Sequence, residues 1–280
     1  MIIFKAKNYT DEIDLIIRNK VEKLYTDKVL AIVSIGRHKS STKFIEIKKK
    51  LAESFNIDTE LFDLKRNAKK KEVFAVLDKI NLNDKYGGVI VQHPFPSKYD
   101  YKEIATRINP EKDIDFFNPK TYGEFVLGIK DDFMPPTVRA FDYISNSFKL
   151  DLKGKVFLVV GQGLIVGRPI ANYLQSKEVT LITANIHTTN LEELLKIADV
   201  VVTGASSPNL IKGEQLKRGA TVIDFSYKEI DKKIIGDFDM NSNINHLSLV
   251  CAVPGGIGPL TIRYLLLNFL DFVEYREQSL

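Results

Sequence analysis

The chain has 280 residues, of which 44% are hydrophobic and 27% are charged, as in an ordinary folded globular protein of one or two domains. Its formal net charge of +4 fits an anionic small-molecule ligand and does not favour nucleic acid, which requires a concentrated basic face. The single cysteine, Cys251, excludes an intrachain disulfide and a Cys-rich zinc site.

In the first half of the chain, apolar strand-like runs alternate with helix-length segments. This alternation, with continuous apolar strands, predicts a mostly parallel sheet covered on both faces. We expect helices at 11–25, 41–55 and 70–80, and strands at 29–36, 59–64 and 87–92. The proline-rich segments HPFP, PEKDIDFFNPKTYGEF and FMPPT that follow are expected to be irregular.

A second α/β pattern of Rossmann type follows the helical segment 138–148. It contains the glycine loop of DLKGKVFLVVGQG, the strands VTLITA, VVVTGA and ATVIDFS, a strand at 247–253, and a last helix at 260–277. We therefore expect two domains. Residues 1–138 and 261–280 form an N-terminal α/β domain to which the last helix returns, and residues 139–260 form a Rossmann-like domain.

The ends of the chain indicate a cytoplasmic protein without a membrane partner. The segment MIIFKAKNYTDEIDL has no apolar signal-peptide core. The apolar segment LTIRYLLLNFLDFVEY is interrupted by Arg263, Asn268 and Asp271, and it is too short and too polar to span a bilayer.

The loop VVGQGLIVGRP (159–169) is similar to a dinucleotide-binding loop but is one residue longer, because its third glycine completes G-x-G-x-x-x-G. An NAD site usually places Asp or Glu about 20 residues past the glycines, on the ribose hydroxyls. The residue near that position is Asn185, which can hydrogen-bond a ribose only as a neutral group. The loop therefore leaves the choice between NAD and NADP open.

One lysine of the helix STKFIEIKKKLAESF does not face outward. At 3.6 residues per turn, Lys48 shares an apolar stripe with Phe44 and Leu51. Lys49 and Lys50 point away from this stripe and are ordinary surface charges. Lys48 either extends past the edge of the core to water or enters a cleft, where burial lowers its pKa and suits it to proton transfer.

Further polar groups follow strands. Gln92 ends the strand GGVIVQ, where ligands of open α/β sheets bind, although a strand-end glutamine is often simply hydrated. Asp113 and Asp115 lie in the loop EKDIDFF and are equally compatible with turn or capping roles. The three glycines of PGGIGP (254–259) allow a backbone to lie close against a flat ligand.

Six motifs together resemble those of the bifunctional methylenetetrahydrofolate dehydrogenase/cyclohydrolases. They are FIEIK (44–48), VQHPFP (91–96), KDIDFF (112–117), PPTV (135–138), GQGLIVGRP (161–169) and AVPGGIGPLT (252–261). The family versions are Y-x-x-x-K, V-Q-L-P-L-P, K-D-V-D-G-F, P-C-T-P, G-R-S-x-x-V-G-x-P and P-V-P-G-G-V-G-P-x-T. Each motif alone is weak, but the ordered set covers nearly the whole chain and identifies it as a member of this family.

The resemblance implies a fold and a reaction. The fold is a two-domain α/β structure, with an N-terminal α/β substrate domain, a Rossmann-like NAD(P)-binding domain and a cleft between them, usually in a homodimer. The reaction oxidises 5,10-methylenetetrahydrofolate to 5,10-methenyltetrahydrofolate with NAD or NADP, and then hydrolyses that cation to 10-formyltetrahydrofolate. A neutral lysine suits the second step, because it can take a proton from the attacking water without opposing the cationic substrate.

The resemblance also implies site residues, and no metal among them. Lys48 is the main catalytic group, Gln92 tunes it and Asp115 holds the pterin. The folate contacts are Phe44, Pro254, Gly255 and Gly256. The cofactor contacts are Gly161, Gln162, Gly163, Val166, Gly167, Asn185, Tyr227 and Thr261.

The chain departs from the family pattern on the substrate side. Phe44 replaces the motif tyrosine and removes a hydroxyl beside the lysine. Pro136 replaces a cysteine, Phe116 replaces a glycine and His93 replaces a leucine. His93 is either a new polar group at the cleft or a solvated loop residue.

The departures on the cofactor side are larger. Gln162 and Gly163 stand where the family has Arg and Ser, and NADP-using relatives direct that arginine at the 2′-phosphate. The segment 184–188, Ala-Asn-Ile-His-Thr, also lacks the serine expected after the next strand. Two alternatives to the bifunctional enzyme therefore remain, a cyclohydrolase that has lost dehydrogenation and a non-catalytic folate-binding paralogue. A shikimate-dehydrogenase-like enzyme has the same two-domain plan but lacks support from the motifs.

Overall fold

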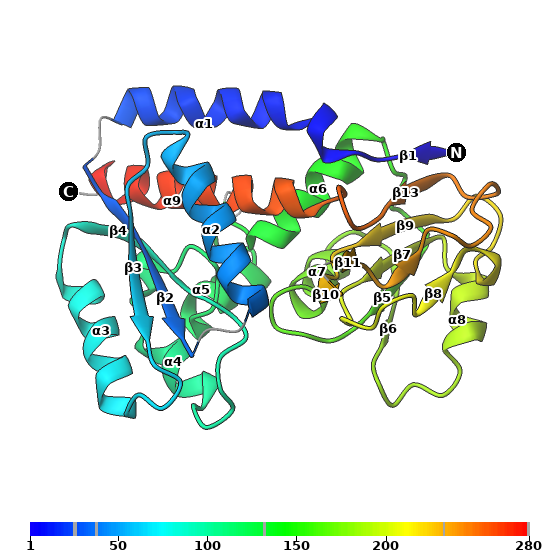
Figure 1. Cartoon of the computed structure of the whole chain (residues 1–280). Helices are drawn as coiled ribbons and strands as arrows, with labels where there is room; N and C mark the ends of the chain where they lie inside the picture. The colour runs from blue at the N-terminus through cyan, green and yellow to red at the C-terminus, as the bar shows by residue number, and fades with distance from the viewer. Residues whose placement is uncertain (25–26, 37–38, 131–132, 232, 279–280) are drawn as a thin grey trace. The chain divides into compact units, whose positions relative to one another are not determined.

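The computed structural model describes residues 1–280 except 25–26, 37–38, 131–132, 232 and 279–280, and leaves the side chains of 39–41 undescribed. Helices and strands alternate along the chain (Figure 1). The chain forms two compact units, which we name after their sheets. The three-stranded unit holds Glu12–Pro136 and Ile262–Leu280, and the six-stranded unit holds Met1–Asp11 and Thr137–Thr261.

The three-stranded unit is built on a parallel sheet of order β3-β2-β4. All residues of β2 are buried, as its continuous apolar run predicts. One face of the sheet packs on α3 and α4 through a core that includes Val33, Leu77 and Ile104. Its elements are α1 (Thr10–Leu24), β2 (Val29–Ile35), α2 (Lys39–Glu53), β3 (Thr59–Leu64), α3 (Lys70–Leu82), β4 (Tyr86–Val91), α4 (Tyr101–Arg107), η2 (Pro110–Lys112), α5 (Pro119–Val126) and most of α9 (Gly258–Gln278).

The middle segment is less irregular than expected, because it contains the short helices α4 and α5. The Asp100 side chain accepts a hydrogen bond from the Lys102 N–H and caps α4. The Asn118 side chain accepts a hydrogen bond from the Lys120 N–H and caps α5, whose first residue is proline. The prediction was wrong here because side-chain caps start these helices, which are only seven and eight residues long.

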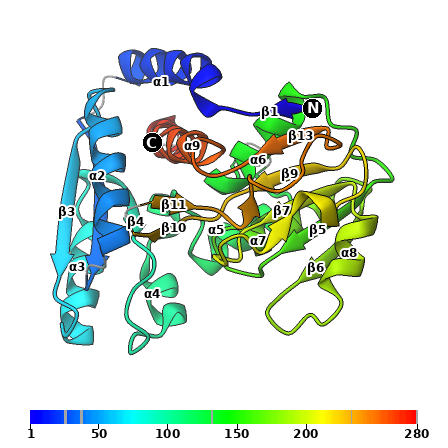
Figure 2. The ribbon, with the colours of Figure 1, turned by 45° about the vertical axis from the view of Figure 1, so that its right-hand side comes forward.

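The six-stranded unit is a parallel sheet of order β1-β13-β9-β7-β5-β6. Figures 1 and 2 show α7 and α8 beside this sheet. Neighbouring residues of a strand point to opposite faces, and in β5 Leu158 packs with Leu195 of α8, while Phe157 packs on Phe141, which in turn contacts Tyr173 of α7. The two helices therefore cover opposite faces. Its elements are β1 (Ile2–Ile3), η1 (Ala6–Asn8), α6 (Pro136–Ser147), β5 (Val156–Val160), α7 (Gly167–Gln175), β6 (Thr180–Ala184), α8 (Leu191–Ile197), β7 (Val200–Thr203), β8 (Ile211–Lys212), η3 (Gly213–Gln215), β9 (Thr221–Asp224), β10 (Lys228–Ile230), β11 (Lys233–Ile235), β12 (Phe238–Asp239) and β13 (Leu249–Cys251).

The strand order of this sheet defines where a ligand is expected. The chain passes from β5 to β6 on one side, and then to β7 on the other side of β5. This reversal creates a topological switch point at the carboxyl ends of β5 and β7, where doubly wound sheets bind their ligands. The predicted α/β class with a Rossmann-like domain is confirmed.

The first eleven residues do not belong with residues 12–136, in contrast to the expected domain 1–138. The strand β1 pairs in parallel with Leu249 and Val250 at the edge of the six-stranded sheet. The Ala6 N–H donates to the Gly255 carbonyl at 2.9 Å. These contacts join distant parts of the sequence, and a local pattern does not reveal them.

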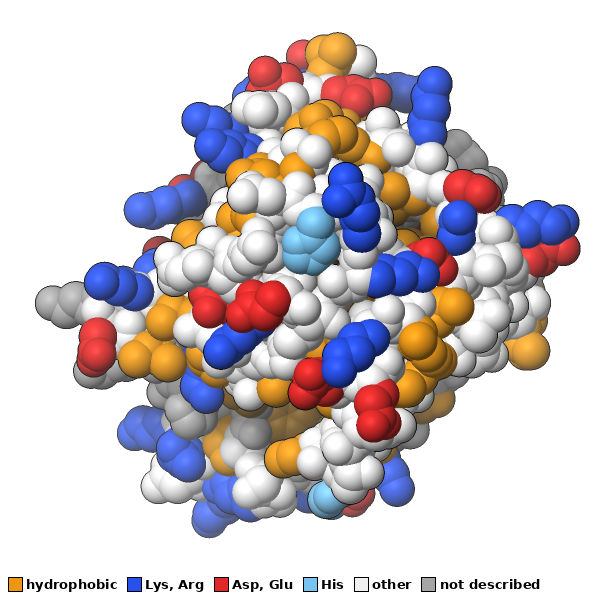
Figure 3. Space-filling view, turned by 90° about the vertical axis from the view of Figure 1, so that its right-hand side faces the viewer, with side chains coloured by type: hydrophobic (Ala, Val, Ile, Leu, Met, Phe, Trp, Pro, Cys, Tyr) orange, Lys and Arg blue, Asp and Glu red, His pale blue; other side chains and the backbone are white. Residues whose placement is uncertain are grey.

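Two surface properties bear on possible partners. None of the described helices has the length and apolar character needed to cross a membrane. On the face in Figure 3, basic and acidic side chains are interspersed, and the residues drawn in colour form no continuous basic patch. The mixed charge on this face agrees with the small net charge of the chain.

Candidate active site

A lysine and a glutamine meet in the three-stranded unit. Lys48 lies on α2, half-buried at the edge of the face that buries Ile45 and Ala52. Gln92 follows β4 and is only 8% exposed. Its Oε1 accepts a hydrogen bond from Lys48 Nζ at 3.0 Å, and its Nε2 donates to the His93 carbonyl at 2.7 Å. These two bonds fix the amide with its oxygen toward the lysine.

Asp115 is the electrostatic neighbour of this lysine. Burial lowers the pKa of Lys48, and the Asp115 carboxylate opposes this shift. Burial likewise raises the pKa of Asp115, and the Lys48 charge opposes it. Both shifts favour the neutral forms, which is the behaviour of acid–base groups in a partly dry site.

The two aspartates of KDID have different environments. Asp113 is fully buried, and its carboxylate accepts hydrogen bonds from the N–H groups of Phe117 at 3.0 Å and Asn118 at 2.7 Å. Burial raises the pKa of Asp113 to about 7, against the effect of these bonds. Lys112 Nζ donates to three backbone carbonyls between residues 80 and 83. Lys112 and Asp113 therefore shape the loop, and Asp115 is the aspartate beside Lys48.

Asn268 supports this loop from α9, a role that the sequence analysis did not predict. Its buried Nδ2 donates to the carbonyls of Ile114 and Met134, both at 3.0 Å. The first bond holds the backbone directly before Asp115. A lone amide within a buried apolar helix is the only sequence signal for such a role, because burying an unpaired amide is costly.

Phe116, which follows Asp115, has φ +59°, a conformation that side chains other than glycine rarely adopt. Its ring packs edge-on against Phe125 and Phe272. Such backbone strain costs about 1–3 kcal/mol, whereas deleting a buried phenylalanine ring costs about 3–5 kcal/mol. The packing of the ring therefore outweighs the strain.

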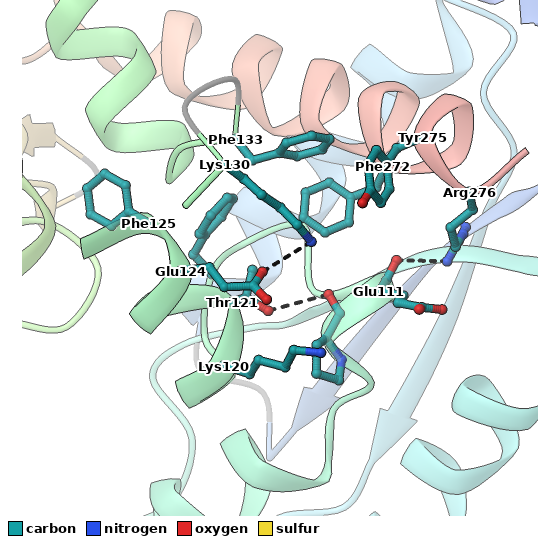
Figure 4. A pocket seen from close by; sticks show the side chains of 12 residues that line it. Glu111, Lys120, Thr121, Glu124, Phe125, Lys130, Phe133, Phe272, Tyr275 and Arg276 are labelled. Carbon is teal, nitrogen blue, oxygen red and sulfur yellow. Dashed lines mark hydrogen bonds and ion pairs between the residues drawn. The ribbon is translucent and has the colours of Figure 1, made fainter. Parts of the chain in front are cut away.

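The same ring lines a cavity of about 230 Å³, together with Phe133 and Tyr275 (Figure 4). Three charged side chains at this cavity, those of Glu124, Lys130 and Arg276, have partners within the protein. Lys130 Nζ pairs with Glu124 Oε2 at 3.2 Å, and Arg276 donates to the Glu111 carbonyl at 2.8 Å. Lys48, Gln92 and Asp115 do not line it, so this cavity is separate from the predicted catalytic group.

The structure contradicts a solvated His93. Its ring lies 4.7 Å, centroid to centroid, from both Phe95 and Phe117. Its Nε2 is buried and has no hydrogen-bond partner among the described residues. Burial, together with the positive charge of Lys48, lowers the pKa of His93 to about 4. The imidazole is therefore neutral at neutral pH and lies beside the lysine.

In the six-stranded unit, the predicted nucleotide loop lies at the switch point. Gly161 directly follows β5 with φ +97°, and a Cβ there would lie 2.8 Å from the Gly204 carbonyl carbon. A Cβ on Gly167, the first residue of α7, would lie 1.8 Å from the Gly161 carbonyl oxygen. A Cβ on Gly204 would lie 2.7 Å from Val166. The loops after β5 and β7 thus interlock, whereas a Cβ on Gly163 would meet no described atom within 4 Å.

Two predicted cofactor residues meet beside this loop. Gln162 Nε2 donates to Thr183 Oγ1 at 3.1 Å, and Asn185 Nδ2 donates to Gln162 Oε1 at 3.2 Å. Asn185 Oδ1 in turn accepts from the His187 N–H at 2.9 Å. Gln162 and Asn185 are exposed and present neutral amides at the carboxyl ends of β5 and β6.

The other predicted contacts of this unit lie after β9 and β13. Tyr227 is half-buried, with its hydroxyl 3.4 Å from Glu229. The Thr261 hydroxyl donates to the Ile257 carbonyl within α9. Pro254 and Gly255 are exposed, while a Cβ on Gly256 would lie 2.4 Å from the Ala252 carbonyl oxygen. The tight turn therefore requires glycine at 256.

Comparison with known families identifies this arrangement. The model of the tetrahydrofolate dehydrogenase/cyclohydrolase catalytic domain matches residues 4–115, and the model of the NAD(P)-binding domain of the same enzymes matches residues 135–277. The chain belongs to the tetrahydrofolate dehydrogenase/cyclohydrolase family. Lys48, Gln92 and Asp115 lie within the catalytic-domain match, and the glycine loop lies within the NAD(P)-binding match.

Individual members of the tetrahydrofolate dehydrogenase/cyclohydrolase family resemble the chain over almost its full length. The bifunctional protein FolD of Aquifex aeolicus is 32% identical over 95% of this chain and 91% of its own. The crystal structure of the Campylobacter jejuni FolD enzyme, 28% identical, superposes with a TM-score of 0.92 over 98% of this chain and 99% of its own. The Trypanosoma brucei FolD structure with NADP and an inhibitor has a TM-score of 0.93 over 99% and 98% of the two chains, and at 24% identity it shows the fold alone.

Proposed function

We propose that the chain oxidises 5,10-methylenetetrahydrofolate to 5,10-methenyltetrahydrofolate with NAD or NADP, and hydrolyses the product to 10-formyltetrahydrofolate. The observation that carries this proposal is the half-buried Lys48, bonded to Gln92 and beside Asp115, in a chain that belongs to this family. A lysine buried without a function would only cost stability.

The hydrolytic step follows from the state of Lys48. A neutral amine accepts a proton from water as the water oxygen attacks the methenyl carbon and forms a hydroxyl adduct. The bond from this carbon to N5 then breaks as N5 gains a proton and the hydroxyl oxygen loses one, which leaves the formyl group on N10. Gln92 holds the amine through its Oε1. Asp115 is proposed to pair with the amino-pyrimidine edge of the pterin, since a carboxylate there makes two directed hydrogen bonds. Phe44 and the turn at Pro254–Gly256 are proposed to contact the folate.

The six-stranded unit fits a nicotinamide dinucleotide. Glycines 161 and 167 form a tight turn at the start of α7, and Gly163 borders open space at the switch point. We propose cofactor contacts from Gly161, Gln162, Gly163, Val166, Gly167, Asn185, Tyr227 and Thr261. When bound, the dinucleotide supplies the hydride acceptor for the first step.

Two assays on the purified protein test the proposal. One follows oxidation of methylenetetrahydrofolate with NAD and with NADP, and the other follows hydrolysis of methenyltetrahydrofolate without a nucleotide, corrected for the spontaneous rate. Activity in both supports the bifunctional enzyme. Activity in the second alone supports a cyclohydrolase, which the neutral Gln162–Asn185 pair favours as the second candidate. Folate binding without either activity would indicate a non-catalytic paralogue.

Gln162→Arg is expected to shift cofactor preference toward NADP. An arginine here would direct its charge at the 2′-phosphate, and a charge-assisted hydrogen bond contributes about 1.5–3 kcal/mol. We therefore expect the ratio of kcat/KM for NADP to that for NAD to rise about 10- to 100-fold. Gln175→Arg, an exposed change later in the same unit, is the control for added charge alone. An equal ratio in both variants would place the 2′-phosphate elsewhere.

Phe44→Tyr is expected to raise the rate of methenyltetrahydrofolate hydrolysis. The residue is one helical turn before Lys48 and half-buried, so a hydroxyl there adds a hydrogen-bonding group near the amine. One such bond contributes about 0.5–1.5 kcal/mol, which corresponds to about a 2- to 10-fold gain in kcat. Unchanged rates would mean that the hydroxyl is dispensable in this background.

We further propose that the enzyme is a homodimer, as the family resemblance implies, and that it acts in the cytoplasm. The free, buried Cys251 fits a reducing compartment. Sedimentation equilibrium of the purified chain tests the dimer, and fractionation of the source cell tests the compartment.

A further inference from the structure

The imidazole of His93 is a polar group without a partner inside the catalytic unit. It lies directly after Gln92, which bonds to Lys48, and its ring packs against Phe95 and Phe117. Its Nε2 is buried and makes no hydrogen bond to any described residue. An unpaired buried nitrogen costs stability, so a folded protein retains one at a functional site when a ligand completes it.

Its position and charge state suit a ligand contact. The residue follows the carboxyl end of β4, where parallel sheets bind their ligands. Because burial keeps the ring neutral, it adds no charge that would repel a cationic methenyl substrate. A neutral imidazole can either donate or accept a single directed hydrogen bond through Nε2.

We propose that His93 is a specificity-determining residue that hydrogen-bonds through Nε2 to a polar group of the bound folate, beside Lys48. This inference rests on the proposed folate activity and adds a contact that the leucine of the family motif at this position cannot make. The unpaired histidine lowers the stability of the free protein, and its hydrogen bond to the ligand raises the affinity of the complex. If the histidine only filled space, replacing it would not change the affinity for the ligand.

Three variants measured in two ways test this contact. In His93→Leu, thermal unfolding of the free protein should shift upward by about 2 °C or more, because the unpaired nitrogen is gone. The Kd for 5-formyltetrahydrofolate, a non-reactive folate, should weaken about 10-fold in the same variant by titration calorimetry. His93→Gln, whose side-chain amide reaches the position of Nε2, should restore Kd to within about threefold, and His93→Ala should not.

The outcomes separate this inference from the proposed function. A wild-type protein that binds the folate, with an unchanged Kd in His93→Leu, would overturn the role of His93 and leave the proposed function intact. A lower unfolding temperature in His93→Leu would also overturn it, because the ring would then be a structural element. A wild-type protein that neither binds the folate nor acts on it would overturn both.

Discussion

Lys48→Met is expected to lower the rate of methenyltetrahydrofolate hydrolysis by about 100- to 10,000-fold, the usual contribution of a positioned general base. Methionine preserves the length and apolar stem of the side chain but cannot accept the proton from water. The thermal midpoint should stay the same or rise, because a buried amine with a lowered pKa is destabilising to the fold. The measurement is the initial rate at saturating substrate, together with a melting curve.

Lys50→Met is the matched control for this variant. It removes the same group from the same helix at an exposed position, so activity should persist. The wild-type rate should rise with pH until Lys48 is deprotonated, and level off below the pH typical of an exposed lysine, since burial lowers its pKa. Full hydrolysis by Lys48→Met, or the same pH dependence in that variant, would refute the role of Lys48.

Gly167→Ala is expected to remove methylenetetrahydrofolate oxidation while sparing hydrolysis. The new Cβ would lie 1.8 Å from the Gly161 carbonyl oxygen, so the turn that opens α7 must shift by more than an ångström. A displacement of that size in a nucleotide loop is expected to lower kcat/KM for the dinucleotide by at least about 100-fold. Hydrolysis should remain, because Lys48 and Gln92 belong to the other unit.

The control for this change is Gly123→Ala, in α5 of the three-stranded unit. A Cβ there meets no described atom within 4 Å, and alanine in a helix is about 1 kcal/mol more favourable than glycine. That variant should retain both activities. Oxidation at the wild-type rate by Gly167→Ala would show that the loop does not hold the cofactor.

The sequence predicted the elements that local patterns determine. The buried strand Val29–Ile35 is a continuous apolar run, and its environment on both faces follows from that run. The helix positions of Lys48 and Lys50 also followed from a 3.6-residue period, although Lys49, expected on the surface, is half-buried. The short helices α4 and α5 escaped prediction, because single capping residues start them and they are only seven and eight residues long.

Less of the candidate site than of the fold could be predicted from the sequence. Asp113 and Asp115 are chemically identical and two residues apart, so their local sequence does not distinguish them, and only the family resemblance singled out Asp115. Their hydrogen bonds and neighbours separate the loop-forming Asp113 from Asp115 beside Lys48. The His93 ring packs against Phe117, which lies more than twenty residues further along the chain. Asn268 acts on the Asp115 loop across an even longer separation.

Because β1 pairs with β13, the segments that encode the two units alternate along the gene. Residues 137–261 of the six-stranded unit interrupt the three-stranded unit in the sequence. The first segment of the chain, Met1–Asp11, also belongs to the six-stranded unit. Deleting the first ten residues would therefore remove an edge strand from the six-stranded unit. The effect would fall on this unit although the deleted residues are nearer in sequence to Lys48 of the other unit. Each unit consists of two separate segments of the chain, so neither can be expressed by cutting the gene once. Dissecting the two activities therefore requires point variants such as those at residues 48 and 167.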